Sequence, residues 1–239
     1  MLSRIFWAGD STVKQNDYTS FPQTGMGQGL PLYLKKDIVI VNRAENGRST
    51  KSFIQEGRLA QIEQELKEGD FLFIQFGHND EKPDEERHTD AFTTYQEYLT
   101  KFVQVARQKK AYPLFITSLY RRLFDENGTL IENTHLDYPQ AMIELAKKLD
   151  VPVIDLCELS KQLIQVSGID QTKEWFMNLP AGKYKNFPEG KQDNSHLQYE
   201  GAVTFAGIVA AELRKLGGVY KELLLPQQIE QEDASLLRD

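Results

Sequence analysis

Cysteine is almost absent from this chain, whose 239 residues include only Cys157. One cysteine cannot close a disulfide within the chain, so the composition fits a reducing compartment, and we expect a cytoplasmic protein. Long apolar runs are also missing, since no segment approaches the about 20 residues that a membrane-spanning helix requires. An apolar strand is expected almost at the first residue, which leaves no room for the parts of an export signal, so we expect none.

Positive charge is in deficit, with 28 Lys and Arg against 35 Asp and Glu and a formal net charge of −7. This balance argues against nucleic acid as the main partner. It does not exclude a polyanionic substrate, because local basic loops can still receive one. Histidine is scarce as well: the chain has four, and they are scattered without the spacing of metal ligands, so we expect no hydrolytic metal site.

What the chain does contain is an alternation of short apolar runs with amphipathic segments. The runs are typical of strands buried on both faces of a parallel sheet, and they cover residues 5–8, 38–41, 71–76, 114–117 and 151–156. Apolar residues at helical spacing predict helices over 92–106, 139–149 and 202–216. This order predicts right-handed βαβ units in an α/β fold, a three-layer α/β/α sandwich around a mostly parallel sheet.

Two long segments fit neither pattern. Residues 120–136 are polar, and residues 175–195 contain two prolines and two glycines, so both are expected to be loops, which at this length are usually functional or mobile. We expect one domain over residues 1–218. The acidic tail, residues 219–239, is expected either to pack on that domain or to fray.

A serine follows the first predicted strand in the sequence Gly9-Asp10-Ser11-Thr12. In an α/β sheet the carboxyl end of a strand is where ligands bind, so Ser11 is a candidate nucleophile. The alternative is that Ser11 caps the start of a helix, which serine commonly does.

A histidine and an aspartate lie close together in the sequence near the C-terminus, where Asp193 precedes His196 by three residues. In a turn this spacing brings both side chains to one side, so the carboxylate can accept from Nδ1–H and leave Nε2 facing a serine. The alternative, which is compatible with the first, is that Asp193 or Ser195 caps the helix over 202–216. Of the other histidines, His88 is expected to be solvated, His135 to have a surface or structural role, and His78 to orient its loop.

Hydrogen-bond donors for an oxyanion are expected after two further strands. Asn79 follows the strand over 71–76, and its side-chain amide offers two N–H groups. Gly47 follows the strand over 38–41, where a glycine lets the backbone N–H approach a substrate, although it can equally be an ordinary loop glycine. All of these segments come just after predicted strands and therefore meet at one edge of the sheet. Together they indicate a Ser-His-Asp hydrolase.

These motifs resemble those of the SGNH (GDSL) hydrolases, and among them those of the rhamnogalacturonan acetylesterases. The similarity spans about residues 3 to 216, and its blocks are Ala8-Gly9-Asp10-Ser11-Thr12, Gly47-Arg48-Ser49, Glu56-Gly57-Arg58, Phe76-Gly77-His78-Asn79-Asp80 and the segment 193–201. One departure is visible, since Gly25-Met26-Gly27 stands where that family often has Gly-Trp-Gly. Met26 lacks the indole N–H, so the sugar-facing wall is expected to differ there.

The resemblance implies a flavodoxin-like sandwich with a five-stranded sheet and a Ser11, His196 and Asp193 triad. It also implies an oxyanion hole made by the Ser11 N–H, the Gly47 N–H and the Asn79 side chain. The implied reaction is removal of acetyl groups from sugar esters, and no metal or organic cofactor is implied.

Substrate recognition is expected in the loop that precedes Asp193, where lysines and aromatics interleave. An aromatic ring such as Tyr184 can stack on a sugar face, and the ammonium groups of Lys183 and Lys185 can pair with uronate carboxylates. The alternative is that these side chains are simply solvated. Further candidates are Arg48, Arg121 and Arg122. The substrate is therefore expected to be a small-molecule or oligosaccharide ester, most simply an acetylated pectic oligosaccharide. The alternatives are a broad GDSL esterase or thioesterase and a non-catalytic carbohydrate-binding protein.

Overall fold

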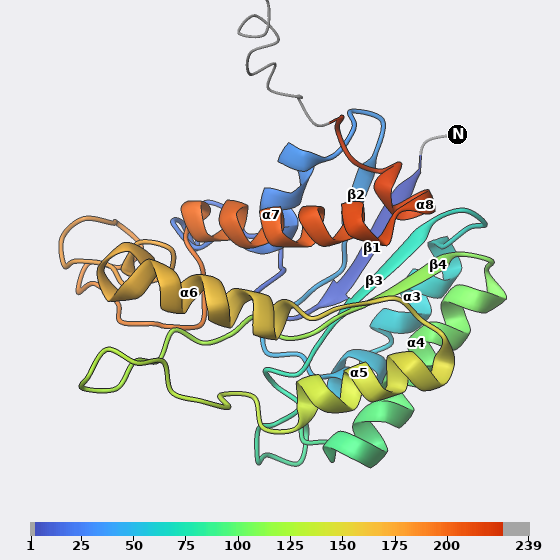
Figure 1. Cartoon of the computed structure of the whole chain (residues 1–239), viewed down its shortest axis with the longest axis horizontal. Coiled ribbons are helices and arrows are strands. Elements are labelled where there is room, and N and C mark those ends of the chain that lie inside the picture. The colour runs from blue at the N-terminus through green and yellow to red at the C-terminus, as the bar shows by residue number, and fades with distance from the viewer. Residues whose placement is uncertain (1–2, 227–239) are drawn as a thin grey trace, which may run out of the picture.

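Five parallel strands form the centre of the computed structural model, which describes residues 3–226 (Figure 1). The strands are β1 (Arg4–Gly9), β2 (Val39–Asn42), β3 (Phe71–Gln75), β4 (Tyr112–Ile116) and β5 (Val153–Ile154). Their order is β2-β1-β3-β4-β5, and every pair is parallel. This is the flavodoxin-like order, and its crossovers change direction between β1 and β3. The predicted fold class is confirmed.

Helices cover both faces of the sheet. In chain order they are α1 (Met26–Gly29), the 3₁₀-helix η1 (Leu30–Tyr33), α2 (Thr50–Gln55), α3 (Arg58–Glu65), the π-helical turn η2 (Ala91–Tyr95), α4 (Gln96–Gln108), α5 (Tyr138–Leu149), α6 (Leu156–Lys173), α7 (Tyr199–Leu216) and α8 (Gly218–Lys221). Helices α1, α6, α7 and α8 pack on one face, and α2, α3, α4 and α5 pack on the other (Figure 1). No helix within residues 3–226 combines the length and apolarity that crossing a bilayer needs.

Alternation along each strand divides the core into two clusters. In β1, Ile5 and Trp7 face α7, whereas Phe6 and Ala8 face α2 and α4, and all four are fully buried. Trp7 packs edge-to-face on Phe73 of β3, with ring centroids 5.7 Å apart. Because both faces of the strand are covered, the sequence of β1 is a continuous apolar run and not an alternating one.

The predicted elements agree with the structure to within a few residues, except around β5. The strand expected over 151–156 is limited to two residues, because Asp155 caps α6 by accepting a hydrogen bond from Glu158 N at 3.2 Å. Helix α6 itself was not predicted. It is interrupted at Gly168, whose φ of 76° and ψ of 178° lie outside the helical region, and its apolar pattern is weak.

The end of the described chain packs on the domain. Leu223 and Leu224 are buried, Leu224 forms an antiparallel bridge with Leu34, and Leu225 N donates to Tyr33 O at 2.9 Å. Most of the tail expected over 219–239 lies outside the described residues, so the division at residue 218 stays a prediction.

Both loops expected from the sequence lie at the carboxyl ends of the strands. Figure 1 shows the segment after β4 and the segment after α6 at the end of the sheet away from the N-terminus. The loop between α6 and α7 contains only isolated bridges, including one between Leu179 and Lys191. The carboxyl ends of β1 and β3 meet at the same edge, beside the point where the crossovers change direction, which is where α/β sheets bind ligands.

Candidate active site

A tight turn after β1 presents Ser11. Asp10 Oδ1 accepts from Thr12 N at 2.9 Å and from Thr12 Oγ1 at 2.8 Å, while the Asp10 carbonyl accepts from Val13 N and Lys14 N, both at 3.1 Å. These bonds hold the turn from both sides and leave Ser11 at its tip. In the described chain the first helix is α1, well beyond this turn, so Ser11 does not cap a helix.

The imidazole of His196 lies between the serine and the aspartate. His196 Nε2 is 2.9 Å from Ser11 Oγ, and Nδ1 is 2.7 Å from Asp193 Oδ2. Asp193 Oδ1 accepts the backbone N–H groups of Ser195 and His196, each at 2.9 Å. With the carboxylate fixed in this way, Nδ1 carries the proton and Nε2 can accept from the serine hydroxyl. The N-cap position of α7 is Gln198, so neither Asp193 nor Ser195 serves as its cap.

His196 and Lys191 keep the Asp193 carboxylate charged. Burial raises the pKa of Asp193, but hydrogen bonds and charge from His196 and Lys191 outweigh burial and hold its pKa below the ordinary value. Lys191 Nζ lies 2.8 Å from Asp193 Oδ2, the same oxygen that bonds to the imidazole. Asp193 is therefore ionised wherever histidine titrates, as a group that stabilises an imidazolium must be.

A buried arginine anchors the loop that carries Asp193 and His196. The Arg122 side chain donates to Thr172 Oγ1 at 2.9 Å, to Asn194 Oδ1 at 3.0 Å and to Ile169 O at 2.6 Å. Its backbone N–H donates to Asn194 O at 2.9 Å. Arg122 is 7% exposed, so the expectation that it binds substrate is replaced by a structural role. Asn194 lies between the two site residues, and its anchoring fixes their backbone.

Among residues 3–226, each of the three N–H donors expected for an oxyanion keeps a hydrogen that no protein atom accepts. Within the described residues, the backbone N–H groups of Ser11 and Gly47 donate to no protein atom. Asn79 Nδ2 donates one hydrogen to Arg48 O at 3.1 Å, and Arg87 Nη1 donates to Asn79 Oδ1 at 3.3 Å. The amide orientation is thereby set, and its second hydrogen remains free. Gly47 has a φ of 73°, a conformation that favours glycine.

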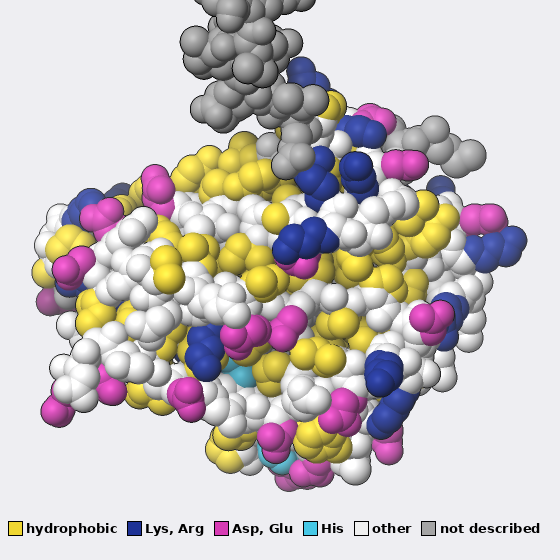
Figure 2. Space-filling model, in the orientation of Figure 1, with side chains coloured by type: hydrophobic (Ala, Val, Ile, Leu, Met, Phe, Trp, Pro, Cys, Tyr) yellow, Lys and Arg dark blue, Asp and Glu magenta, His cyan; other side chains and the backbone are white. Residues whose placement is uncertain are grey.

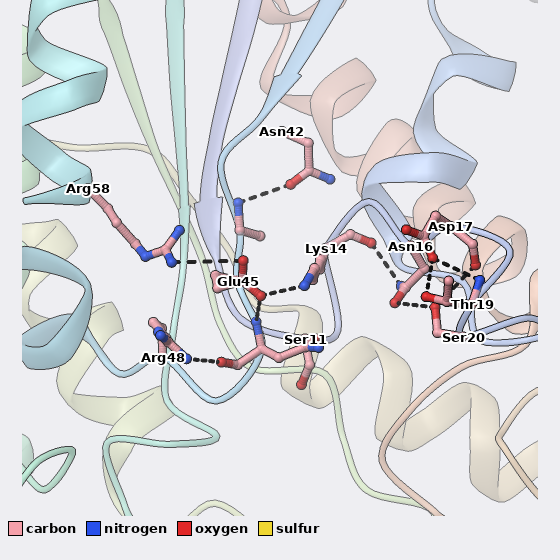
Figure 3. A network of polar contacts seen from close by, with 12 residues as sticks. Ser11, Lys14, Asn16, Asp17, Thr19, Ser20, Asn42, Glu45, Arg48 and Arg58 are labelled. Atoms are coloured by element: carbon pink, nitrogen blue, oxygen red, sulfur yellow. Dashed lines mark hydrogen bonds and ion pairs between the residues drawn. The ribbon is translucent and has the colours of Figure 1, made fainter. Parts of the chain in front are cut away.

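A polar network holds the Gly47 loop against the serine turn. Glu45 N donates to Gly9 O at 3.1 Å, and the Glu45 carboxylate pairs with Lys14 and lies 3.8 Å from Arg58. Figure 3 shows Ser11 beside this network, with Glu45 between the two cations. The network therefore ties the segment after β2 to the segment after β1.

Buried Asp80 joins the segments after β2 and β3. Its carboxylate accepts from Thr50 N at 3.0 Å, from Thr50 Oγ1 at 2.5 Å and from Thr89 Oγ1 at 3.2 Å. Burial raises the pKa of Asp80 to about 7, although these three hydrogen bonds act in the opposite direction. Asp80 therefore fixes the start of α2 next to Asn79.

The other three histidines do not reach the serine. His88 is exposed, as expected. His135 is buried, bonds to Leu119 O at 2.8 Å and packs edge-to-face on His78 with ring centroids 4.4 Å apart. Burial also holds the pKa of His78 well below its ordinary value, so that ring is neutral. Of the four histidines, His196 is the one bonded to the Ser11 hydroxyl.

We expect Asn79→Ala to lower kcat on p-nitrophenyl acetate about 10²–10³-fold with little change in KM, because an oxyanion donor acts in the transition state. Steady-state kinetics of the purified variant provide the measurement. The exposed loop variant Asn127→Ala serves as control and should retain the wild-type kcat. An unchanged kcat in Asn79→Ala would remove this residue from the oxyanion hole.

The residues expected to bind substrate fall into two groups. Lys183 and Tyr184 line a groove of about 1060 Å³ together with residues that sequence reasoning did not single out, among them Phe21, Lys191 and Tyr199. Figure 2 shows charged and hydrophobic side chains mixed on the loop end of the molecule. Lys185 is exposed and does not line this groove.

The remaining arginine candidates are already paired. Arg48 binds Glu56 through Nε at 2.9 Å and Nη2 at 2.9 Å, and Arg121 pairs with Glu81. Both guanidinium groups are therefore already engaged with carboxylates of the chain. The role of Arg48 in substrate binding stays a prediction.

A hydroxyl, an imidazole and a carboxylate in hydrogen-bonded series, at the carboxyl edge of a flavodoxin-like sheet, define the site of an acyl hydrolase. The sequence model of the GDSL-like Lipase/Acylhydrolase family matches residues 8–194, and the chain belongs to this family. The membership expected from the sequence motifs is thus confirmed.

Several known proteins are similar to the chain. It is 42% identical over 225 residues to rhamnogalacturonan acetylesterase RhgT of Bacillus subtilis, which covers 94% of this chain and 95% of that protein. It is 38% identical to a second protein of that organism, described as "Probable rhamnogalacturonan acetylesterase YesY", over 95% of this chain and all of the relative. Among solved structures, protein YxiM of Bacillus subtilis superposes with a TM-score of 0.77 at 26% identity. That match covers 91% of this chain and 57% of YxiM.

Proposed function

We propose that the chain is a serine acetylesterase that removes acetyl groups from carbohydrate esters through an acetyl-enzyme intermediate. One observation carries the proposal: Ser11 Oγ, His196 and Asp193 form a continuous series with contacts of 2.9 and 2.7 Å. A binding module has no need of this series, which argues against a non-catalytic carbohydrate-binding role.

In the first half-reaction Ser11 Oγ attacks the acetyl carbonyl carbon while His196 Nε2 takes the hydroxyl proton. The carbonyl electron pair moves to oxygen, where the Ser11 and Gly47 N–H groups and the free Asn79 hydrogen stabilise it. The intermediate then collapses, the bond between the acetyl carbon and the sugar oxygen breaks, and the sugar hydroxyl leaves with the proton from His196. Asp193 keeps the imidazolium oriented throughout.

In the second half-reaction water attacks the acetyl group on Ser11 and gives a proton to His196. Acetate leaves, and the proton returns to Ser11 Oγ, which restores the free enzyme. Every proton in this cycle moves through His196 Nε2. The cycle consumes one water and yields the sugar hydroxyl and one acetic acid, which ionises to acetate and a proton.

The substrate class is proposed on two grounds. Two relatives that are 42% and 38% identical carry the name rhamnogalacturonan acetylesterase, the second with the qualifier given above. The groove beside Asp193 is lined by aromatic rings and lysines, groups that stack on sugar rings and pair with uronate carboxylates. We therefore infer that the substrate is an acetylated pectic oligosaccharide. The single cysteine supports a reducing, cytoplasmic location, where such substrates would be short oligomers.

Acetate release from acetylated galacturonate-containing oligosaccharides is expected to exceed release from acetylated xylo-oligosaccharides about tenfold in kcat/KM, since one charge-assisted contact accounts for such a factor. Acetate is measured enzymatically with both substrates at matched acetyl concentration. A p-nitrophenyl ester series from acetyl to octanoyl is the companion test. Equal rates on both glycans would remove uronate recognition, and a preference for octanoyl would favour a broad esterase.

A further inference from the structure

Lys191 is held by backbone hydrogen bonds at the end of the loop that forms the groove. Leu179 N donates to Lys191 O at 2.7 Å, and Lys191 N donates to Leu179 O at 3.0 Å. Gly190 makes this approach possible, because a Cβ there would lie 2.5 Å from Leu179 O. The Lys191 ammonium also lies over the Phe187 ring, 5.4 Å from its centroid. The lysine is therefore directed by its backbone and by packing, unlike an ordinary surface lysine.

The ammonium of Lys191 acts on the same oxygen as the imidazole. It lies 2.8 Å from Asp193 Oδ2, and the lysine and aspartate side chains are only 29% and 15% exposed. An ammonium at this position neutralises part of the carboxylate charge. It therefore opposes the formation of a second cation, the His196 imidazolium, which the reaction requires.

Lys191 also lines the groove, with two of its three ammonium hydrogens left for a ligand. The groove is not basic as a whole, because its lining contains as many glutamates as lysines. The glutamates are Glu174, Glu189 and Glu200, and the lysines are Lys173, Lys183 and Lys191. Recognition of an anion there therefore depends on a local contact. Among the described residues that line the groove, Lys191 is the one cation that reaches the triad.

We propose that Lys191 couples the groove to the triad: a carboxylate of the substrate glycan shares the Lys191 ammonium with Asp193 and so accelerates deacetylation of acidic glycans over neutral ones. The coupling rests on the proposed function. A bound carboxylate draws the positive charge away from Asp193, and Asp193 then stabilises the imidazolium more fully. Lys191 is a positioning residue in this scheme, since it acts on the reacting atoms through Asp193 and His196.

The charged groups around the pair are few. Among residues 3–226, Asp193 forms ion pairs only with Lys191 and His196. On its other side His196 faces Ser11, and it also interacts electrostatically with buried Asp10 and with neutral His78. None of these neighbours supplies a positive charge to Asp193 in place of Lys191. Removing the Lys191 ammonium should therefore change the measured rates.

The test uses one acetylated galacturonate disaccharide in two forms, with free carboxylates and with both carboxyls as methyl esters. Wild-type kcat/KM for acetate release is expected to be about tenfold higher for the acid than for the ester. Lys191→Met should bring this ratio close to one, and Lys191→Arg should retain most of it. Lys147→Met, an exposed variant of α5 with the same change of charge, is the control and should keep the wild-type ratio.

A second readout separates electrostatic coupling from structural damage. With p-nitrophenyl acetate, the acid limb of the kcat/KM profile of Lys191→Met is expected to move to higher pH by about half a unit, because a cation near the imidazole is gone. A merely structural defect would lower the rate without moving this limb.

The outcomes are distinct. A wild-type preference for the acid that persists in Lys191→Met, or equal wild-type rates on the two forms, overturns the coupling and leaves the acetylesterase function standing. Cleavage of p-nitrophenyl acetate without acetate release from either disaccharide overturns both. Loss of the preference in Lys191→Met together with the shifted limb supports the coupling.

Discussion

Ser11→Ala is expected to lower kcat on p-nitrophenyl acetate by about 10⁵-fold, because it removes the atom that forms the acetyl-enzyme. The substitution deletes one oxygen at the tip of a turn that is held by Asp10 and Thr12, so the fold should be unaffected. The rate is measured with enzyme purified from a host without other esterases, and folding is checked by thermal unfolding.

Two further variants make this expectation specific. Ser167→Ala, on α6, deletes the same oxygen away from the site and should retain the wild-type rate. The double variant Ser11→Ala with His196→Ala should be no slower than Ser11→Ala alone, since residues that act as one unit are not additive. Wild-type activity in Ser11→Ala would mean that another nucleophile performs the reaction.

Asp193→Asn is expected to lower kcat by about 10⁴-fold near neutral pH with the fold intact. Asp193 Oδ1 is fixed by two backbone N–H groups, so an asparagine that keeps this oxygen presents its NH₂ group to His196 Nδ1. Nδ1 must then accept, and the ring proton moves to Nε2, where it faces Ser11 Oγ and blocks proton transfer. Steady-state kinetics on p-nitrophenyl acetate give the measurement.

The matched control for Asp193→Asn is Asp150→Asn. Asp150 is exposed and ends α5 in the left-handed conformation, with a φ of 51°, which asparagine also adopts readily. It should therefore retain both rate and stability. A loss below tenfold in Asp193→Asn would show that the imidazole does not depend on this carboxylate.

Much of this architecture was predictable because parallel strands have a simple signature. Buried apolar runs predicted β1 to β4 to within two residues at each end, and residues that follow such strands must lie at one edge of the sheet. For this reason the sequence predicts that Ser11, Gly47 and Asn79 lie at the same edge of the sheet. The pairing of Asp193 with His196 followed from their spacing.

The long-range contacts were not predictable, because they depend on how loops fold. Nothing in the sequence around Arg122 shows that it is buried against Asn194, 72 residues away. The contact of Asp80 with Thr50 spans 30 residues, and nothing in the sequence near either residue indicates it. Lys191 could have been noticed from its position two residues before Asp193, but only the loop geometry turns its ammonium onto that carboxylate.

Helix α6 shows a different limit. Its first half follows Asp155 without a break from the apolar run of β5, so strand and helix read as one segment in the sequence. Its second half follows Gly168, where the chain leaves the helical region before it turns again. Apolar spacing is the main signal for a helix, and both interruptions obscure it.

Labelling with a fluorophosphonate tests the central claim most directly, because the reagent reacts only with a serine whose proton a neighbouring base removes. Mass spectrometry of the labelled protein is expected to find one adduct, on Ser11, with labelling slowed more than about 10²-fold in His196→Ala. An adduct on any other residue, or undiminished labelling of Ser11→Ala, would contradict the account.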